Sequence, residues 1–241
     1  MRREHHPFWY QRFLTVVHQR LAEHFLLPQF ASTGKEPRFS GFHYMHVQGP
    51  SIHVGDNFHA FATAAQPLSL AVNPYDGGMG EGEILIGNYC ILSSGTRIRS
   101  ACSIRIGDNT MIAERCLITD ADWHDAYHRI FPGKREPVRI GNNVWIGDSV
   151  TICKGVTIGD NSIIGAASVV TRDVPANSIA AGNPARVVSE LDPTQPSSRR
   201  EHLFVGGQPY DDFKNDYDRA RLAGNTFSKW LRTLLFPHNE D

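Results

Sequence analysis

The sequence predicts an all-β solenoid, a parallel β-helix, on three observations. From Ile140 to Val170 an aliphatic residue stands at every sixth position. In these units the second position is usually Gly and the fifth is Val or Ser. A second block with the same spacing precedes them, between Ile86 and Ile118. This period differs from the ~3.6 residues of a helix and the ~2 of a strand, and it is typical of hexapeptide repeats in parallel β-helices.

Each position of the repeat has a physical role. We expect one hexapeptide on each side of a triangular prism, with its first residue pointing into a narrow core. Gly at the second position lets the backbone turn near a corner, because Gly tolerates positive φ. The fifth residue must be small or β-branched to fit beside the stacked first residues. One unit alone buries almost nothing, so stability comes from stacking the coils.

The upstream block has two phases. Its aliphatic positions are Ile86, Leu92, Ile98 and Ile104, followed with a two-residue offset by Ile106, Ile112 and Ile118. The slip predicts a corner at Ser103–Arg105. Residues 52–58 look like an imperfect first coil. We therefore expect the β-helix to span residues 51–190, with a helical and irregular segment at residues 1–50 and a linker followed by a helical tail at residues 191–241.

Composition narrows the function classes. The chain has 241 residues and a net charge of −1, without a basic run that would indicate nucleic-acid binding. No apolar stretch approaches the ~18 residues of a membrane span, and the N-terminus lacks the pattern of a signal peptide. We expect a cytoplasmic protein. The four Cys lie at small positions of the repeat without a CxxC pair, which favours packing over redox or zinc chemistry.

The terminal segments contain three predicted helices. Apolar residues recur at helical spacing over residues 8–27, and Pro28 ends this helix. Two more helices are expected at residues 210–223 and 227–236. The last one is amphipathic and basic. It either packs on protein, the prism or a neighbouring subunit, or makes a weak contact with a membrane surface.

A long insertion interrupts the repeat at residues 119–139. Solenoids place insertions on one face, which is often the functional one. This insertion concentrates groups that can do chemistry: Asp120, Asp122, His124, Asp125, His128 and Arg129. We expect the active site here.

Four segments resemble the hexapeptide-repeat O-acetyltransferases, whose best-known branch acts on maltose and galactosides. They are residues 140–147, 155–166, 169–175 and 180–188. The resemblance covers about residues 51–190. It implies a left-handed β-helix, transfer from acetyl-coenzyme A, and a homotrimer with active sites in clefts between prisms. It also implies a catalytic His in the loop before the Ile-Gly-Asn-Asn-Val-Trp coil, where this chain has Asp-Trp-His-Asp.

The chemistry of acyl transfer fits that loop. Attack of a hydroxyl on a thioester needs a base that is neutral near pH 7, and His has the right unperturbed pKa. We predict that His124 is the general base, with His128 as its rival. A carboxylate or backbone carbonyl on the far nitrogen would fix the tautomer, and Asp120 or Asp122 could supply it.

The resemblance also implies cofactor and acceptor residues. Asp148 and Ala166 would line the pantetheine channel, while Thr171, Arg172 and Arg186 would approach the phosphates and adenine, as Arg geometry suits phosphate. No metal is expected. The acceptor side would involve Ser93, Trp123, His128 and Trp145. Ser93 stands where the sugar branch has Asn, and Trp145 walls the cleft or covers a subunit interface.

Several functions share this architecture. The leading prediction is O-acetylation of a sugar or glycan hydroxyl, and an amino sugar is the alternative acceptor. A zinc enzyme of the γ-carbonic anhydrase type would need three His at a spacing that His124 and His128 do not match. A non-catalytic β-helix subunit would not account for the reactive insertion.

Overall fold

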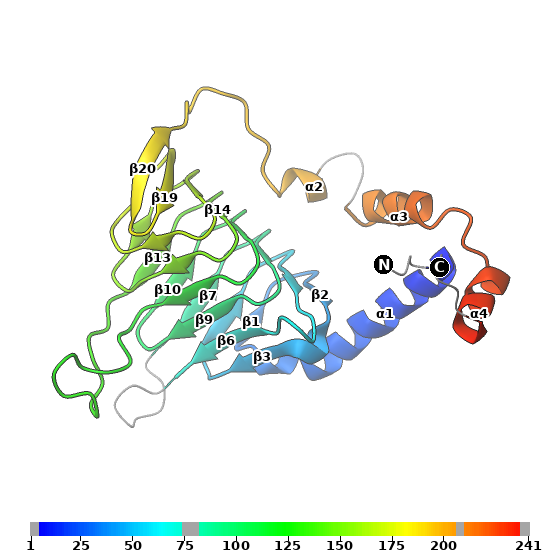
Figure 1. The fold of residues 1–241 in the computed structure, drawn as a ribbon, viewed down its shortest axis with the longest axis horizontal. Coiled ribbons are helices and arrows are strands. Elements are labelled where there is room, and N and C mark those ends of the chain that lie inside the picture. Colours follow the sequence, from blue (N-terminus) through cyan, green and yellow to red (C-terminus); the bar gives the residue numbers. More distant parts are fainter. Residues whose placement is uncertain (1–4, 74–81, 206–209, 237–241) are drawn as a thin grey trace. The chain divides into compact units, whose positions relative to one another are not determined.

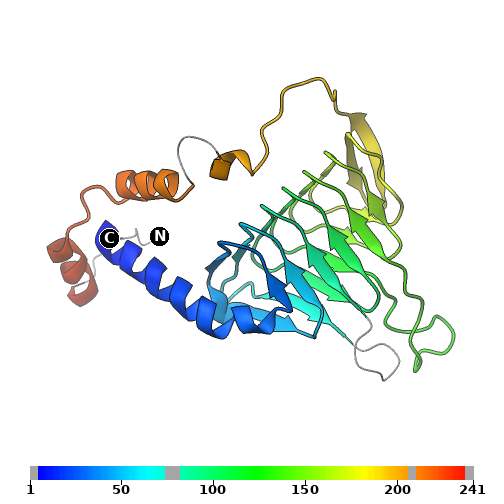
Figure 2. The ribbon, with the colours of Figure 1, turned by 180° about the vertical axis from the view of Figure 1, so that it is seen from behind.

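The computed structural model describes residues 5–73, 82–205 and 210–236, shown in Figures 1 and 2. The chain divides into two compact units, which are described separately. Unit 2 contains residues 21–200 and holds all the strands. Unit 1 contains residues 1–20 and 201–241, and the regular elements of its described part are helices.

Unit 2 is built from three sheets that the chain visits in turn. Sheet A contains β1 (Ser32–Thr33), β4 (Ile52–Val54), β7 (Ile84–Ile86), β10 (Ile104–Ile106), β13 (Val138–Ile140) and β16 (Thr157–Ile158). Sheet B contains β2 (Arg38–Ser40), β5 (His59–Phe61), β8 (Ile91–Leu92), β11 (Met111–Ile112), β14 (Trp145–Ile146), β17 (Ile163–Ile164), β19 (Ser178–Gly182) and β20 (Ala185–Glu190). Sheet C contains β3 (Met45–Gln48), β6 (Leu68–Val72), β9 (Arg97–Ser100), β12 (Leu117–Thr119), β15 (Thr151–Ile152) and β18 (Val169–Val170). Neighbouring strands are parallel except β19 and β20, so the predicted parallel β-helix is confirmed.

The first residues of the repeat stack in three columns inside the prism. In sheet A, Ile86, Ile106, Ile140 and Ile158 pair in register from coil to coil. Sheets B and C carry the corresponding columns, and all these side chains are buried. Each fully buried aliphatic side chain contributes about 1.5–3 kcal/mol relative to an exposed one. The columns therefore explain the six-residue period.

The β-helix begins earlier than residue 51. β1, β2 and β3 already form a coil that pairs with β4, β5 and β6. This coil escaped detection because its buried side chains include the aromatic Phe39 and Phe42 and do not follow the hexapeptide spacing. The end of α1 (Phe8–Phe25) closes the core with Ala22, and Leu26 beyond the helix is also buried. A short 3-10 helix, η1 (Leu27–Gln29), follows, and a second, η2 (Phe42–Tyr44), lies within the first coil.

The two extra residues that shift the repeat lie earlier in the chain than the predicted corner at Ser103–Arg105. Ile104 belongs to strand β10 and pairs with Ile84 and Val138, so it is not a corner residue. The corner instead falls between β9 and β10, after Ser100. A longer turn there leaves both Ile104 and Ile106 pointing inward.

The repeated Gly has a different role from the one predicted. Gly55 and its equivalents at this corner do not have positive φ; that conformation occurs two residues later, at Asn57, Tyr89, Asn109, Asn143 and Asn161. A Cβ on Gly55 would lie 2.6 Å from Oδ1 of Asn88 and 2.7 Å from the carbonyl carbon of Gly87. The Gly is therefore needed because successive coils approach closely at the corner between sheets A and B.

A ladder of side-chain hydrogen bonds follows the same A–B corner. The backbone N–H of Asp56 donates to Asn88 Oδ1 at 2.8 Å, and that of Asn88 donates to Asp108 Oδ1 at 2.7 Å. The next two rungs are Asp108 N–H to Asn142 and Asn142 N–H to Asp160. The Asp or Asn at the third position of each repeat at this corner, from Asn88 to Asp160, thus satisfies a corner amide of the preceding coil.

The cysteines of the prism are free thiols. Cys90 and Cys116 are buried, and burial raises the pKa of Cys90 to about 12 and that of Cys116 to about 11. Both side chains therefore stay neutral near pH 7 and act as small apolar groups, as predicted for the fifth position of the repeat.

Unit 1 has its own aromatic contacts. It contains α1 up to Arg20, α2 (His202–Val205), α3 (Tyr210–Arg221) and α4 (Phe227–Leu235). Tyr10 of α1 packs on Trp230 of α4 with ring centroids 4.6 Å apart. Asn225 Nδ2 donates to the carbonyl of His6 at 3.2 Å. In the described ranges, no helix has the length and hydropathy needed to cross a membrane.

Candidate active site

The insertion at residues 119–139 leaves the prism at the corner between sheets C and A. It follows β12 and returns at β13, and it starts as two antiparallel segments. Asp122 N–H donates to the Lys134 carbonyl at 2.7 Å, and Gly133 N–H donates to the Asp122 carbonyl at 3.0 Å. These bonds give the insertion a fixed base from which the remaining residues extend.

His124 lies just beyond this base. Its Nδ1 is 2.8 Å from the backbone carbonyl oxygen of Arg129, and its side chain is exposed. A carbonyl only accepts hydrogen bonds, so a neutral imidazole bound this way carries its proton on Nδ1. The Nε2 lone pair is then available as a base. The backbone carbonyl of Arg129 thus orients the His124 imidazole, a role for which the sequence offered Asp120 or Asp122.

Asp120 is engaged in the prism corner. Its carboxylate is fully buried and accepts hydrogen bonds from Ser100 Oγ at 2.6 Å, Ala101 N–H at 2.7 Å and Cys102 N–H at 2.9 Å. These three donors belong to the corner that absorbs the two extra residues between β9 and β10. The geometry makes Asp120 a structural carboxylate, in contrast to the catalytic role predicted from the sequence.

Asp122 pairs with Lys154 of the following coil. Their Oδ2 and Nζ atoms are 2.8 Å apart, and the hydrogen bond to Asp122 raises the pKa of Lys154. Lys154 was not singled out from the sequence. Counting the coils would have found it, because Lys154 lies between β15 and β16, at the corner where the insertion leaves the preceding coil.

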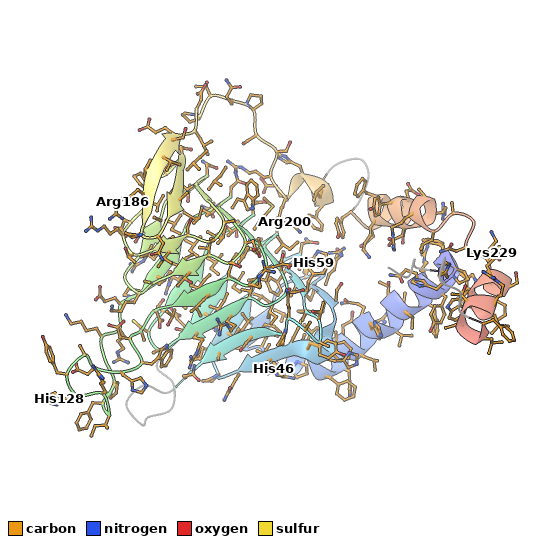
Figure 3. All side chains as sticks on the ribbon, viewed as in Figure 1. His46, His59, His128, Arg186, Arg200 and Lys229 are labelled. Carbon is orange, nitrogen blue, oxygen red and sulfur yellow. The ribbon has the colours of Figure 1, made fainter. Side chains whose placement is uncertain are left out.

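The tip of the insertion is organised by Asp125. Its Oδ1 accepts the backbone N–H groups of Tyr127 and His128, both at 2.8 Å, and these bonds lower the pKa of Asp125. The side chains of Tyr127, His128 and Ile130 are exposed. His128 projects from the tip, as Figure 3 shows. In one chain its imidazole therefore faces the solvent.

Trp123 contacts a cation on the prism. The guanidinium carbon of Arg99, in β9, lies 4.5 Å from the centroid of the Trp123 ring. Trp123 is half-buried by its surroundings. This contact holds the residue before His124 against sheet C. Arg99 carried no sequence signal, because it is an ordinary outward position of a strand.

Five of the predicted cofactor and acceptor residues lie at two different corners of the prism. Ser93, Asp148 and Ala166 follow strands of sheet B, at the corner between sheets B and C. Asp148 forms an ion pair with Arg115 and accepts a hydrogen bond from Ser149 Oγ at 3.1 Å. Thr171 and Arg172 follow β18, at the same C–A corner as the insertion, and both are exposed.

Arg186 lies at one end of the prism, on the antiparallel strand β20 (Figure 3). Its Nη1 donates to the carbonyl of Ala185 at 2.8 Å, and its side chain is exposed. Within a single chain the predicted residues therefore do not form one site. His124 lies at the same corner as Thr171 and Arg172, whereas Ser93, Asp148 and Ala166 lie at another corner.

The outer face of sheet B carries an apolar ladder. Its members pair in register from coil to coil and are Ile91, Met111, Trp145, Ile163 and Ile179. Trp145 is 49% exposed and Met111 is 36% exposed. Met111 and Trp145 are thus the most exposed part of a continuous apolar strip along this face.

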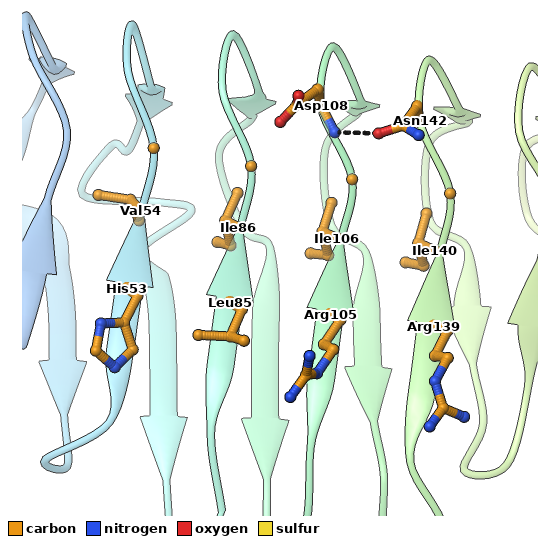
Figure 4. A pocket seen from close by; sticks show the side chains of 14 residues that line it. His53, Val54, Leu85, Ile86, Arg105, Ile106, Asp108, Arg139, Ile140 and Asn142 are labelled. Atoms are coloured by element: carbon orange, nitrogen blue, oxygen red, sulfur yellow. Dashed lines mark hydrogen bonds between the residues drawn. The ribbon is translucent and has the colours of Figure 1, made fainter.

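The outer face of sheet A has an open groove of about 540 Å³. Its lining includes His53, Leu85, Arg105 and Arg139, and the glycines of the A–B corner form one edge (Figure 4). Arg105 is paired with Glu83 at 2.7 Å. None of the site residues predicted from the sequence lines this groove. Among the described residues, we find no group of three or more His, Cys, Asp or Glu side chains that could hold a metal ion.

Comparisons with known proteins agree with this architecture. Residues 137–172 match the family model "Bacterial transferase hexapeptide (six repeats)". The galactoside O-acetyltransferase of Escherichia coli (strain K12) is 46% identical over 105 residues, which are 42% of this chain and 49% of that protein. The chain thus spans about half the length of this curated relative, and less of others that it matches.

Solved structures share the fold. AntD, an N-acyltransferase from Bacillus cereus solved as a point mutant with dTDP-4-amino-4,6-dideoxyglucose and coenzyme A, superposes with a TM-score of 0.57 at 19% identity, over 82% of this chain and 96% of that one. The hexapeptide-repeat acetyltransferase VCA0836 from Vibrio cholerae gives a TM-score of 0.50 at 23% identity, over 72% of this chain and 81% of that one. At these identities the likeness concerns the fold alone.

Proposed function

We propose that this chain is a hexapeptide-repeat acyltransferase that transfers an acetyl group from acetyl-coenzyme A to a hydroxyl of a sugar or glycan, as its match to the hexapeptide family model and its likeness to acetyltransferases support. The observation that carries the proposal is the hydrogen bond between His124 Nδ1 and the Arg129 carbonyl. It leaves Nε2 as a base on the insertion that departs from a regular prism. The family relation supports a left-handed winding of the coils.

In the proposed reaction, His124 Nε2 takes the proton of the acceptor hydroxyl while the hydroxyl oxygen attacks the thioester carbonyl carbon. The carbonyl π electrons move to oxygen, and a backbone N–H stabilises the resulting oxyanion. Collapse of this intermediate breaks the C–S bond. The thiolate of coenzyme A leaves and takes the proton from His124, so that the products are the ester and the free thiol.

The proposed donor site uses residues whose chemistry fits coenzyme A. Asp148 and Ala166 lie on successive coils, joined by the backbone bond from Ala167 N–H to the Asp148 carbonyl, and the small Ala166 leaves room for the pantetheine arm. Arg172 and Arg186 are exposed cations that suit the phosphates. Thr171 adds a hydroxyl donor next to Arg172.

We propose that a second copy completes the site. The insertion lies at the C–A corner, whereas Ser93, Asp148 and Ala166 lie at the B–C corner. If the grooved face of sheet A packs on the apolar face of sheet B of the next copy, the A–B corners converge on one axis. The insertion of one copy then reaches the B–C corner of the next. Repeating this head-to-tail contact closes a ring, and the prism shape favours three copies.

The test measures turnover with acetyl-coenzyme A and a panel of sugar and amino-sugar acceptors. The release of the free thiol of coenzyme A is the readout. We expect His124→Ala to lower kcat by about 10²–10⁴-fold, the usual contribution of general base catalysis. His128→Ala is the matched control, since it removes another exposed imidazole of the same insertion. Coenzyme A should still raise the melting temperature of both variants.

Other outcomes would redirect the proposal. Normal turnover of His124→Ala together with loss in His128→Ala would transfer the role of base to His128. Faster turnover with amino sugars than with hydroxyl acceptors would replace O-acylation by N-acylation. The absence of any thermal shift with coenzyme A or its thioesters would refute the transferase assignment.

A further inference from the structure

Unit 1 exposes an apolar stripe on α4. Phe227, Leu231, Leu234 and Leu235 recur at helical spacing and lie on one side of the helix. They are 53%, 41%, 61% and 62% exposed, respectively. Trp230, at the border of the stripe, packs on Tyr10. The helix therefore uses Trp230 to attach to α1 and leaves most of its apolar side uncovered.

The stripe continues onto α1. The ring centroids of Trp9 and Phe227 are 6.5 Å apart, so the two helices share one apolar surface. Phe13 and Val16 follow Trp9 at helical spacing, and all three are more than half exposed. A surface of this kind, built by two helices and several large side chains, exceeds the scattered apolar residues normal for a monomer.

The helix segments that carry this surface are basic. Residues 8–20 and 227–235 contain Arg12, Arg20, Lys229 and Arg232, and neither segment contains Asp or Glu. On α4, Lys229 stands on the side opposite the leucines, and Arg232 stands at the flank of the stripe. The acidic residues of the described part of unit 1 are concentrated on α3, where Lys214, Arg219 and Arg221 pair with Asp216 or Asp218.

We propose that α4 and the adjoining part of α1 dock on the surface of an anionic phospholipid bilayer. A helix that lies in the interface buries one apolar side among the acyl chains and presents Lys and Arg to the headgroups. Anionic lipids attract each such cation, and the attraction fades with added salt. A protein partner would instead have to match the cations with its own carboxylates. The inference concerns unit 1 and does not depend on the acyltransferase activity.

The experiment is co-sedimentation of the full chain with vesicles of phosphatidylcholine containing roughly one third phosphatidylserine, compared with pure phosphatidylcholine. We expect binding to the anionic vesicles that weakens with salt. Leu231→Ser combined with Leu235→Ser should abolish it. Lys229→Gln combined with Arg232→Gln should weaken it by about tenfold or more. All variants should keep the helical circular dichroism and melting temperature of the wild type.

The matched control lies on α3. Phe213→Ser combined with Tyr217→Ser removes two exposed aromatic residues, 55% and 61% exposed, from the acidic helix and should leave vesicle binding unchanged. The proposal is overturned if the wild type does not bind anionic vesicles, if both vesicle types bind equally, or if the control variant loses as much binding as the leucine variant. Leucine variants that change only the oligomeric state would assign the surface to a second copy of the chain.

Discussion

Replacing Asp120 by Asn tests whether this carboxylate serves the prism or the reaction. The native group accepts three hydrogen bonds in a fully buried corner, from Ser100 Oγ and from the N–H groups of Ala101 and Cys102. The amide of Asn keeps one acceptor oxygen, which can stay with Ala101. The Ser100 hydroxyl can rotate and accept from the new NH2. The Cys102 N–H then faces a donor and loses its partner.

The cost follows from that one orphaned group and the lost charge. A buried donor without a partner costs about 1–3 kcal/mol, and hydrogen bonds to a charged acceptor are the stronger kind. We therefore expect Asp120→Asn to destabilise unit 2 by about 3 kcal/mol. At roughly 2–4 °C per kcal/mol for a chain of this size, the melting temperature should fall by roughly 6–12 °C.

The assay combines differential scanning calorimetry with turnover measured well below the melting temperature. Asp56→Asn is the control, because Asp56 Oδ1 accepts an exposed backbone bond from Lys35 that the amide oxygen can keep. Its melting temperature should stay close to that of the wild type. An unchanged melting temperature of Asp120→Asn together with a kcat as low as that of His124→Ala would refute this reasoning and restore the catalytic role of Asp120.

Two further predictions concern the insertion and the shared site. Asp125 has a lowered pKa, so the stability that its hydrogen bonds give to the tip is present above its ordinary pKa of 3.8 and is lost as the pH falls through the lowered pKa. Amide hydrogen exchange should therefore show the N–H groups of Tyr127 and His128 protected at pH 5 and unprotected near pH 2. In Asp125→Ala both groups should be unprotected at both pH values. Mixed oligomers of His124→Ala and Ala166→Trp, each inactive alone, should regain part of the activity after joint refolding, because an intact insertion then meets an intact B–C corner of another copy. Absence of recovery, despite mixed oligomers seen by native mass spectrometry, would place the complete site within one chain.

The repeated part of the fold could be predicted because its packing is dictated by nearest neighbours. A narrow core accepts one aliphatic residue per side, so Ile140 and the residues in phase with it report the architecture directly. The first coil and the corner after Ser100 could not be predicted in this way. Their residues depend on contacts that break the period, namely aromatic side chains at the end of the stack and the buried Asp120.

The site shows the same division. The insertion and His124 stand out because the sequence departs there from a strict pattern. The group that orients His124 is the backbone carbonyl of Arg129. Because every residue has such a carbonyl, the residue type at position 129 does not predict this role. Lys154 and Arg99 look like ordinary outward residues, and only the stacking of coils brings them to Asp122 and Trp123.

The ladder along the A–B corner has a direction. Each corner amide, from Lys35 through Asp56, Asn88, Asp108 and Asn142, is satisfied by a side chain that comes later in the chain. Each corner amide therefore depends on a side chain of the following coil, so removing one coil would leave the corner amide of the preceding coil without its partner. The series stops at Asp160, because Ala176, at the corresponding position of the next coil, has no acceptor in its side chain. The corner ladder thus ends with the coil before the one that contains β19, and at that end of the prism the antiparallel pair β19 and β20 follows.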